Sequence, residues 1–258
     1  GYLVAPDDVL NPTKDDALQY GAHLLGGVEL ELIENLETKL EGWYKSFDQI
    51  TNVNRQRVLP EEPDFLAETG KAWGVDVTLK YRWHQLYAYA SYSLAKVTRD
   101  DGVQVYNPVF DRRHTANLVA SYRLGSLTAK SSTRRLDDKW EFSLRWTLGT
   151  GFPFTQTSGF YEELGFNGGL AEGGLEEQNG DLGFLLSNQL NNGRLPTYHR
   201  MDVSAKRRWR LGEDLILEAN VTLINTYNRA NIFYYDRVRN LRVDQLPLVP
   251  NVGVSFTF

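Results

Sequence analysis

The stretch Asn251–Phe258, NVGVSFTF, closes the chain and decides the fold. Its apolar residues occupy every second position, and small or polar residues fill the positions between them. Successive side chains of a β-strand point to opposite faces, so this period of two predicts a strand with one apolar face. A soluble chain usually ends in polar residues that fray. An apolar face that continues to Phe258 therefore predicts apolar surroundings on that side.

The same alternation recurs along the chain and predicts about nine strands in all, each of roughly ten to fourteen residues. Strands of soluble proteins usually have about five or six residues, whereas membrane-spanning strands need about 9–11. Strand length therefore favours an antiparallel transmembrane β-barrel over a β-sandwich. Two segments, Gln85–Val97 and Leu215–Asn225, carry apolar residues on both sides, so their facing stays open. The clearest apolar sets are Val28, Leu30 and Leu32; Leu36, Leu40 and Tyr44; Trp73, Val75, Val77, Leu79 and Tyr81; Ala116, Leu118, Ala120 and Tyr122; Trp140, Phe142, Leu144, Trp146 and Leu148; and Met201, Val203 and Ala205.

Composition narrows the classes of protein. The 258 residues carry a net charge of -5, which argues against nucleic-acid binding because such proteins present a basic face. Cysteine is absent, so the chain has no disulfide, thiolate nucleophile or cysteine-ligated metal. The sequence also lacks the run of about 18 apolar residues that a spanning helix needs, which excludes a helical membrane protein.

The connections between the predicted strands alternate in length. Short turns are predicted near Glu34–Leu36, Arg82–Gln85 and Leu211–Asp214, whereas long polar loops are predicted at Thr51–Gly70, Thr98–Asp111, Phe152–Thr197 and Thr226–Leu246. Outer-membrane barrels have short periplasmic turns and longer external loops. The pattern therefore predicts which end of each strand lies outside the cell. Gly125–Lys139 departs from it, because this connection falls on the short side and is long.

In such a barrel the two faces of each strand meet different surroundings. The apolar face would contact lipid, and Trp140 and Trp146, six residues apart on that face, span roughly 20 Å, close to the apolar band of about 25 Å. We therefore expect them in aromatic girdles, with the ordinary preference of aromatic residues for strands as the alternative. The opposite face would line the lumen and contact a plug or water. Its charged residues are Glu29, Glu31, Glu37, Lys39, Glu41, Asp76, Lys80, Glu141 and Arg145.

Counting strands backwards from Phe258 places the start of the first predicted strand, near Tyr20, outside the cell. Gly1–Gln19 is then an external segment. Single-chain bacterial barrels usually have an even number of strands, so an odd count predicts that more barrel precedes Gly1. The chain is therefore expected to be the C-terminal part of a larger protein.

Candidate ligand-binding residues lie in the long segment Phe152–Thr197. From Trp146 to Gly193 the chain has no Lys or Arg and is rich in Gly and Glu, so a lid, a plain solvated loop, or a segment that binds cationic ligands or Ca²⁺ all stay open. Aromatic side chains can stack on ligands or pack the loop on itself. Those of this segment are Phe152, Phe154, Phe160, Tyr161 and Phe184.

Enzymatic and metal chemistry have little support in the sequence. Motifs for serine hydrolases, zinc proteases and phosphate-binding loops are absent. The four histidines are far apart, and adjacent acids such as Asp100–Asp101 point to opposite faces of a strand, so they make a poor dyad. We therefore expect no catalytic residue, metal site or cofactor.

Several stretches together resemble the TonB-dependent outer-membrane receptors. They are NPVFDRRHTANLVASYRLG (107–125), GTGFPFTQTSG (149–159), LPTYHRMDVSAKRRW (195–209), VTLINTYNRANIFYY (221–235) and LPLVPNVGVSFTF (246–258), with KAWGVDVTLKYR (71–82) and LEGWYKSF (40–47) fitting the same set. Each motif is loose, but their order and spacing cover the chain from about Asn11 to Phe258. A strand that ends on Phe, here with Val254, Phe256 and Phe258, also resembles the signal read by the barrel-assembly machinery.

The resemblance implies a barrel of about 22 strands, plugged by an N-terminal domain, in the outer membrane of a Gram-negative bacterium. This chain would supply about nine C-terminal strands and lacks the plug and first strands. Such a receptor binds a scarce nutrient, such as a metal chelate, cobalamin, a glycan or a peptide, and imports it with energy from the TonB complex. Some members also carry a surface lipoprotein.

Two alternatives stay open at this stage. A small complete outer-membrane barrel enzyme of the protease type would need a tenth strand in Gly1–Gln19, where Pro12 and clustered Asp disfavour one. A soluble β-sandwich binding protein would need a second sheet or other element against each apolar face.

Overall fold

The computed structural model describes residues 19–258 except 56, 58, 125–138, 163–181 and 212–214. Within these residues the regular secondary structure is entirely β, and no helix is long and apolar enough to cross a membrane. The predicted all-β class is therefore confirmed. The expected external segment Gly1–Gln19 lies, apart from Gln19, outside the described residues, as does nearly all of the unusually long connection Gly125–Lys139.

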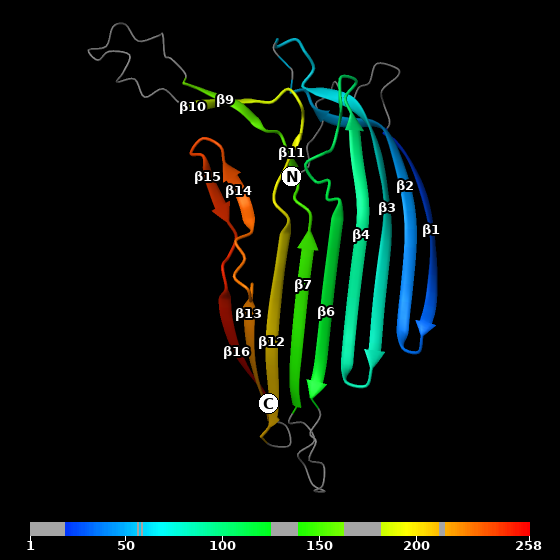
Figure 1. Cartoon of the computed structure of the whole chain (residues 1–258), viewed down its shortest axis with the longest axis vertical. Helices are drawn as coiled ribbons and strands as arrows, with labels where there is room; N and C mark the ends of the chain where they lie inside the picture. The colour runs from blue at the N-terminus through cyan, green and yellow to red at the C-terminus, as the bar shows by residue number, and fades with distance from the viewer. Residues whose placement is uncertain (1–18, 56, 58, 125–138, 163–181, 212–214) are drawn as a thin grey trace, which may run out of the picture.

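One antiparallel sheet dominates the described part of the chain (Figure 1). Its path has nine strands, which confirms the predicted number, and their lengths run from 9 to 19 residues. The two-residue strand β5 (Val105–Tyr106) adds to β4. In spatial order the nine are β1 (Tyr20–Ile33), β2 (Leu36–Val53), β3 (Phe65–Trp83), β4 (Leu86–Asp100), β6 (His114–Leu124), β7 (Lys139–Gly149), β12 (Tyr198–Arg210), β13 (Ile216–Ile224) and β16 (Val249–Thr257).

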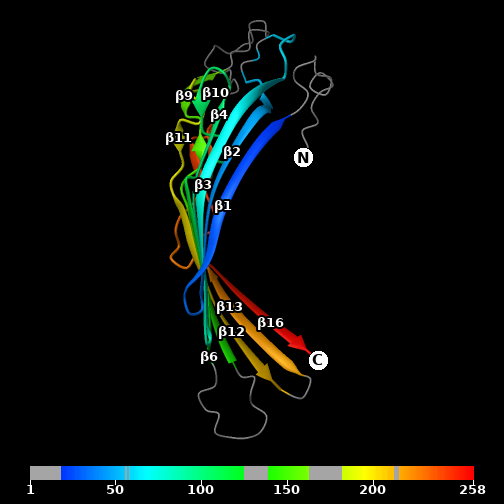
Figure 2. The same ribbon diagram turned by 90° about the vertical axis from the view of Figure 1, so that its right-hand side faces the viewer.

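The main sheet is open in the described structure. Strands β1 and β16 are the two ends of its path, and each pairs with one neighbour only. No closed barrel is therefore present within the described residues. Figure 2 shows the sheet twisted and bent into an arc whose upper and lower ends curve towards the same side.

The two ends of the sheet differ as the connection lengths predict. At the lower end in Figure 1, Glu34–Asn35 joins β1 to β2 and His84–Gln85 joins β3 to β4, so these short turns are confirmed. At the upper end the connections are long but less irregular than predicted, because they contain short strands of their own. These strands form three small ladders: β8 (Pro153–Phe154) with β11 (Gly193–Arg194), β9 (Thr157–Glu162) with β10 (Leu182–Leu186), and β14 (Ile232–Asp236) with β15 (Leu241–Asp244).

Register gives the main sheet one apolar face and one polar face. Along one row the partners are Ala88, Ala120, Leu144, Val203 and Leu223. Along the adjacent row, which points to the opposite face, they are Tyr87, Ser121, Ser143, Ser204 and Thr222. The row through Leu144 defines the apolar face and the row through Ser143 defines the polar face. The two strands of open facing follow the same rule, with Leu86, Ala90, Tyr92, Leu217, Ala219 and Val221 on the apolar face.

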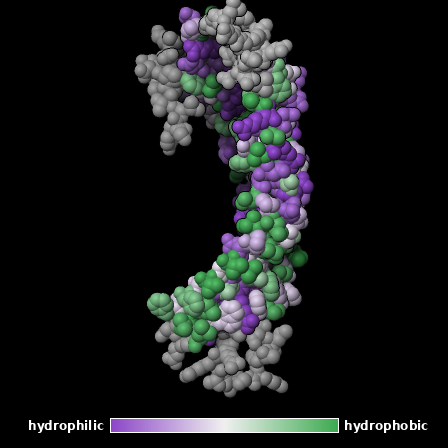
Figure 3. All heavy atoms as spheres, turned by 90° about the vertical axis from the view of Figure 1, so that its left-hand side faces the viewer, coloured by the Kyte–Doolittle hydropathy of each residue, from purple (hydrophilic) through white to green (hydrophobic). Residues whose placement is uncertain are grey.

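The apolar face is uncovered in the described structure. Trp73 is 42% exposed, Val75 39%, Phe142 44% and Val252 70%. Figure 3, which looks onto the β16 side, shows hydrophobic residues gathered over its lower part and hydrophilic residues above. Among the described residues only Ala72 and Tyr106 are buried hydrophobic residues, so the described part of the chain has almost no conventional core.

Charges gather on the polar face and pair across strands. Register places Glu29, Glu31, Glu37, Lys39, Glu41, Asp76, Lys80, Glu141 and Arg145 together on this face, although whether it lines a lumen stays a prediction. Lys80 Nζ lies 2.8 Å from Glu37 Oε2. A longer row of ion pairs crosses β6, β7, β12 and β13. Glu141 lies 3.5 Å from Arg123 and 3.8 Å from Lys206. Glu218 lies 3.9 Å from Lys206 and 3.0 Å from Arg208.

Candidate functional site at the long-loop end

Two cavities lie among the long connections. We call the first the amide pocket; it has a volume of about 560 Å³ and its polar lining includes Asn52, Glu68, Gln104 and Asn188. We call the second the arginine pocket; it has a volume of about 580 Å³ and its lining includes Arg112, Arg229 and Arg242. Both volumes fall within the range of about 300–1,000 Å³ typical of small-molecule sites.

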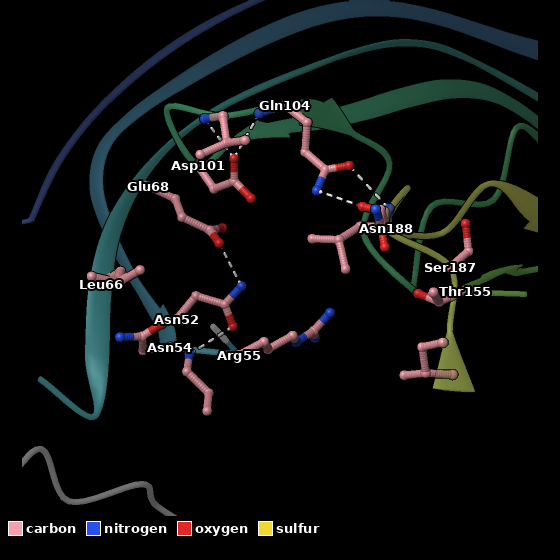
Figure 4. Close-up of a pocket in the computed structure, with 14 residues that line it drawn as sticks. Asn52, Asn54, Arg55, Leu66, Glu68, Asp101, Gln104, Thr155, Ser187 and Asn188 are labelled. Carbon is pink, nitrogen blue, oxygen red and sulfur yellow. Dashed lines mark hydrogen bonds between the residues drawn. The ribbon is translucent and has the colours of Figure 1, made fainter. Parts of the chain in front are cut away.

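A buried carboxylate organises the amide pocket (Figure 4). Glu68 is 5% exposed and accepts hydrogen bonds from the Tyr106 hydroxyl, at 2.9 and 2.8 Å, and from Asn52 Nδ2 at 2.7 Å. Arg99 Nη1 lies 3.6 Å from Glu68 Oε2. A β-bulge between Phe47 and Ile50 shifts the register of β2, and this shift places Asn52 on the same face as Glu68. The charge of Glu68 is thus compensated within the protein.

Gln104 joins two long connections across the amide pocket. Its Nε2 donates to the Asn188 carbonyl at 3.2 Å, and its Oε1 accepts from the Leu190 amide at 3.0 Å (Figure 4). Asp101 Oδ1 fixes the turn before it by accepting from the backbone amides of Val103 and Gln104. Asp101 therefore shapes a turn.

We expect Tyr106→Phe to lower the free energy of unfolding by about 1–3 kcal/mol, because buried Glu68 would lose a hydrogen-bond donor. Burial, followed by the hydrogen bond to Glu68, raises the pKa of Tyr106 to about 12. Because the folded-state pKa is raised above 10, this stabilisation is present below pH 10 and is lost as the pH rises through 12. Denaturant titration of the wild type and of Tyr106→Phe measures the change in the free energy of unfolding. The absorbance of tyrosinate against pH measures the pKa of Tyr106. Equal losses for Tyr106→Phe and the half-exposed control Tyr234→Phe would contradict this role.

The arginine pocket is built around Arg112. The Arg112 Cζ lies 4.2 Å from the ring centroid of Phe152 and 6.0 Å from that of Tyr198. Gly149 makes this position accessible, since a Cβ there would lie 2.5 Å from Arg112 Cζ. Burial lowers the pKa of Arg112. No hydrogen bond or ion pair joins its guanidinium to another described residue, and its buried Nε has no partner among them.

Buried polar contacts hold the segment that carries Arg112. Asp111 is fully buried, accepts a hydrogen bond from the Val97 amide at 2.8 Å, and pairs with Arg194 of β11. Arg194 Nη1 also donates to the Asp111 and Gly151 carbonyls, each at 3.2 Å. The Asp111–Arg194 contact therefore fastens the segment before β6 to those that flank β8 and β11.

Two asparagines position the segment 229–231, which forms part of the lining of the arginine pocket. Asn225, fully buried, accepts from the Arg229 amide at 3.0 Å and donates to the Arg229 carbonyl at 2.9 Å. Asn231 donates to the His199 carbonyl at 2.9 Å, which ties this segment to the start of β12. Asn225 has a φ of 55°, a left-handed conformation that asparagine adopts more readily than most residues.

The five aromatic residues predicted to bind ligand do not form one cluster. Phe152 lines the arginine pocket. Phe154 and Phe184 lie 6.0 and 5.6 Å from Arg237, while Phe160 faces Phe184 across the β9–β10 ladder and Tyr161 packs over Gly183. Their role as ligand contacts stays a prediction.

The sequence interpretation missed the arginines. It emphasised the acidic composition of Trp146–Gly193 and cationic ligands, whereas the described cavity next to Phe152 is basic. Arg112, Tyr198 and Arg229 occur within the motifs quoted for the family resemblance, but their separation in sequence hides their proximity. The described residues contain no group of three or more metal-ligating side chains. His114 and His199 instead hydrogen-bond to Tyr92 and Tyr227, at 2.8 and 2.7 Å.

No protein-family model matches the chain, and no curated protein matches its sequence. The resemblance to the TonB-dependent receptors therefore rests on the motifs of the sequence, and the site has to be interpreted from its own geometry.

Proposed function

We propose that this chain forms part of the wall of a transmembrane β-barrel in a TonB-dependent receptor of the outer membrane of a Gram-negative bacterium. One observation carries the proposal: nine long antiparallel strands present a continuous apolar face that the described residues leave uncovered. A soluble domain of about 250 residues would bury roughly three quarters of its surface around an apolar core. This chain has two buried hydrophobic residues in its described part.

Lipid supplies the missing apolar surroundings in this proposal. Transfer of a large apolar side chain out of water is worth about 1.5–3 kcal/mol, so an exposed face of this extent would be strongly unfavourable in water. The described residues contain no second sheet of comparable size to cover it, which disfavours a β-sandwich. The polar face, with its paired charges, suits a water-filled or plugged lumen.

The two free edges support a larger barrel. Unpaired backbone N–H and C=O groups are costly in hydrocarbon, so membrane sheets close on themselves. Strands β1 and β16 expose such groups in the described structure. Pairing with further strands of a barrel of about 22 would satisfy them, as the resemblance implies.

The function that follows is nutrient capture and import. Ligand would bind at the end of the barrel that carries the long connections, where both described pockets lie, and TonB-driven rearrangement of the plug would admit it. The barrel performs no bond chemistry in this mechanism. Its partners would be outer-membrane lipid, the plug, the TonB complex, the barrel-assembly machinery, for which Val254, Phe256 and Phe258 are the candidate signal, and in some cases a surface lipoprotein.

Single cysteines test the proposal directly, because these 258 residues contain none and any cysteine elsewhere in the full-length protein can first be replaced by serine. Leu144→Cys and Ser143→Cys place a thiol on the apolar and polar face of the same strand. In the full-length protein in lipid vesicles, a fluorophore at 144 should be quenched by nitroxide-labelled acyl chains, and one at 143 should not. The same response at both positions would contradict a membrane wall.

A further inference from the structure

Resting on the proposed function, we propose that the arginine pocket binds the carboxylate of a small anionic ligand whose planar apolar part packs against the neighbouring aromatic rings. The guanidinium of Arg112 would donate hydrogen bonds to the carboxylate. This assigns the site and the charge class of the ligand, where the resemblance alone admits neutral glycans and anionic chelates alike.

Arg112 carries the strongest argument. Its charge is partly removed from water, yet no described carboxylate or carbonyl accepts a hydrogen bond from it. A guanidinium has five donors in a rigid planar fork that matches the two oxygens of a carboxylate. Desolvated charges in proteins are normally paired. A bound anion would supply the missing acceptor.

The remaining charges of the pocket favour the same ligand. Its described lining contains three arginines and no acidic residue. Arg242 is already engaged, with Nε 2.6 Å from Asp244 and a bond of 2.7 Å to the Ala230 carbonyl. Arg229 uses one nitrogen, at 2.9 Å from the Thr197 carbonyl, while its buried Nε has no partner among the described residues. Donors therefore remain on two of the three arginines.

The aromatic lining of the arginine pocket is the reason for proposing a ligand with a planar apolar part. Phe152, Tyr198 and Phe233 line the cavity, and Phe152 is 38% exposed. Aromatic faces pack well on flat apolar groups. The amide pocket lacks this combination, because it holds Glu68 and Asp101 and a single arginine, Arg55. The two pockets therefore differ in the charged residues that line them.

Benzoate and its neutral isostere benzamide provide matched probes. We expect benzoate to bind the full-length protein in detergent micelles measurably, and benzamide at least about tenfold more weakly, because only the carboxylate can pair with Arg112. Isothermal titration calorimetry against empty micelles measures both. Absence of benzoate binding, or equal affinity for the two probes, would overturn the inference.

Two variants of Arg112 and one control variant test whether Arg112 binds benzoate. Arg112→Gln should weaken benzoate binding about tenfold or more, and Arg112→Lys, which keeps the charge and loses the fork, should fall between this variant and the wild type. Arg239→Gln removes the same charge from an exposed arginine at the same end and should change nothing. Equal effects of Arg112→Gln and Arg239→Gln would overturn the assignment. The two single-cysteine variants, Ser143→Cys and Leu144→Cys, measured in lipid vesicles, show separately whether the chain forms a membrane wall.

Discussion

Leu144→Arg should sharply reduce the amount of protein that reaches the folded, membrane-inserted state, whereas Ser143→Arg should be tolerated. Leu144 lies at the middle of β7 on the apolar face, between Ala120 and Val203. An arginine facing lipid at the bilayer midplane costs about 2–4 kcal/mol in a β-barrel. Ser143 lies one residue away on the polar face, between two other serines, and is similarly half-buried.

Urea unfolding of the full-length protein in lipid vesicles, together with its yield in the outer membrane, measures both variants. The two substitutions add the same charge to adjacent residues of one strand. A difference between the two variants in the free energy of unfolding or in yield therefore reflects the different surroundings of the two faces. Equal destabilisation by the two substitutions would contradict a lipid-facing role for Leu144. Greater damage from Ser143→Arg would indicate that the faces are assigned the wrong way round.

The periodicity of the sequence accounts for most of the main sheet. In β7 every second residue from Trp140 to Leu148 is apolar, and the register confirms that Trp140 and Trp146 share a face. Long strands with strict alternation leave little freedom, because a slip of one residue would move every side chain to the other face. Strand number, the two short turns within the described residues and the facing of most residues therefore follow from the sequence alone, whereas the predicted turn Leu211–Asp214 lies, apart from Leu211, outside the described residues.

Non-local pairing explains what the sequence did not reveal. The facing of β4 was open because Tyr87 and Tyr89 are as apolar as their neighbours, and only pairing with Ser121 and Val119 of β6 places them. The ladder β9–β10 joins residues on either side of 163–181, and no local pattern announces such a partner. The arginine pocket is the same case, since Arg112, Tyr198 and Arg229 meet only when three long connections fold together.

Asp111→Ala should destabilise the long-loop end by about 1–3 kcal/mol, the usual cost of leaving a buried hydrogen-bonding group without its partner, because Arg194 is 35% exposed and its charge stays in contact with water. Fully buried Asp111 accepts from the Val97 amide and pairs with Arg194, so its removal leaves the Val97 amide without this acceptor and leaves Arg194 with backbone carbonyls alone as acceptors. Asp111→Asn keeps an oxygen for Val97 and loses the charge, so an intermediate loss is expected. Arg112 follows directly in sequence, and benzoate binding should weaken along with stability.

Limited proteolysis distinguishes this local effect from collapse of the sheet. Cleavage should appear in the long connections of Asp111→Ala while the far-UV circular dichroism of the protein is nearly unchanged, because the Asp111 side chain reaches the main sheet through one hydrogen bond, from the Val97 amide near the end of β4. Asp64→Ala is the matched control, since Asp64 also pairs with an arginine, Arg57, but is 53% exposed and should lose less than about 1 kcal/mol. Comparable losses at positions 111 and 64 would show that Asp111 does not fasten this end. Protection of the loops together with loss of benzoate binding would instead place Asp111 in ligand contact, a role that its complete burial argues against.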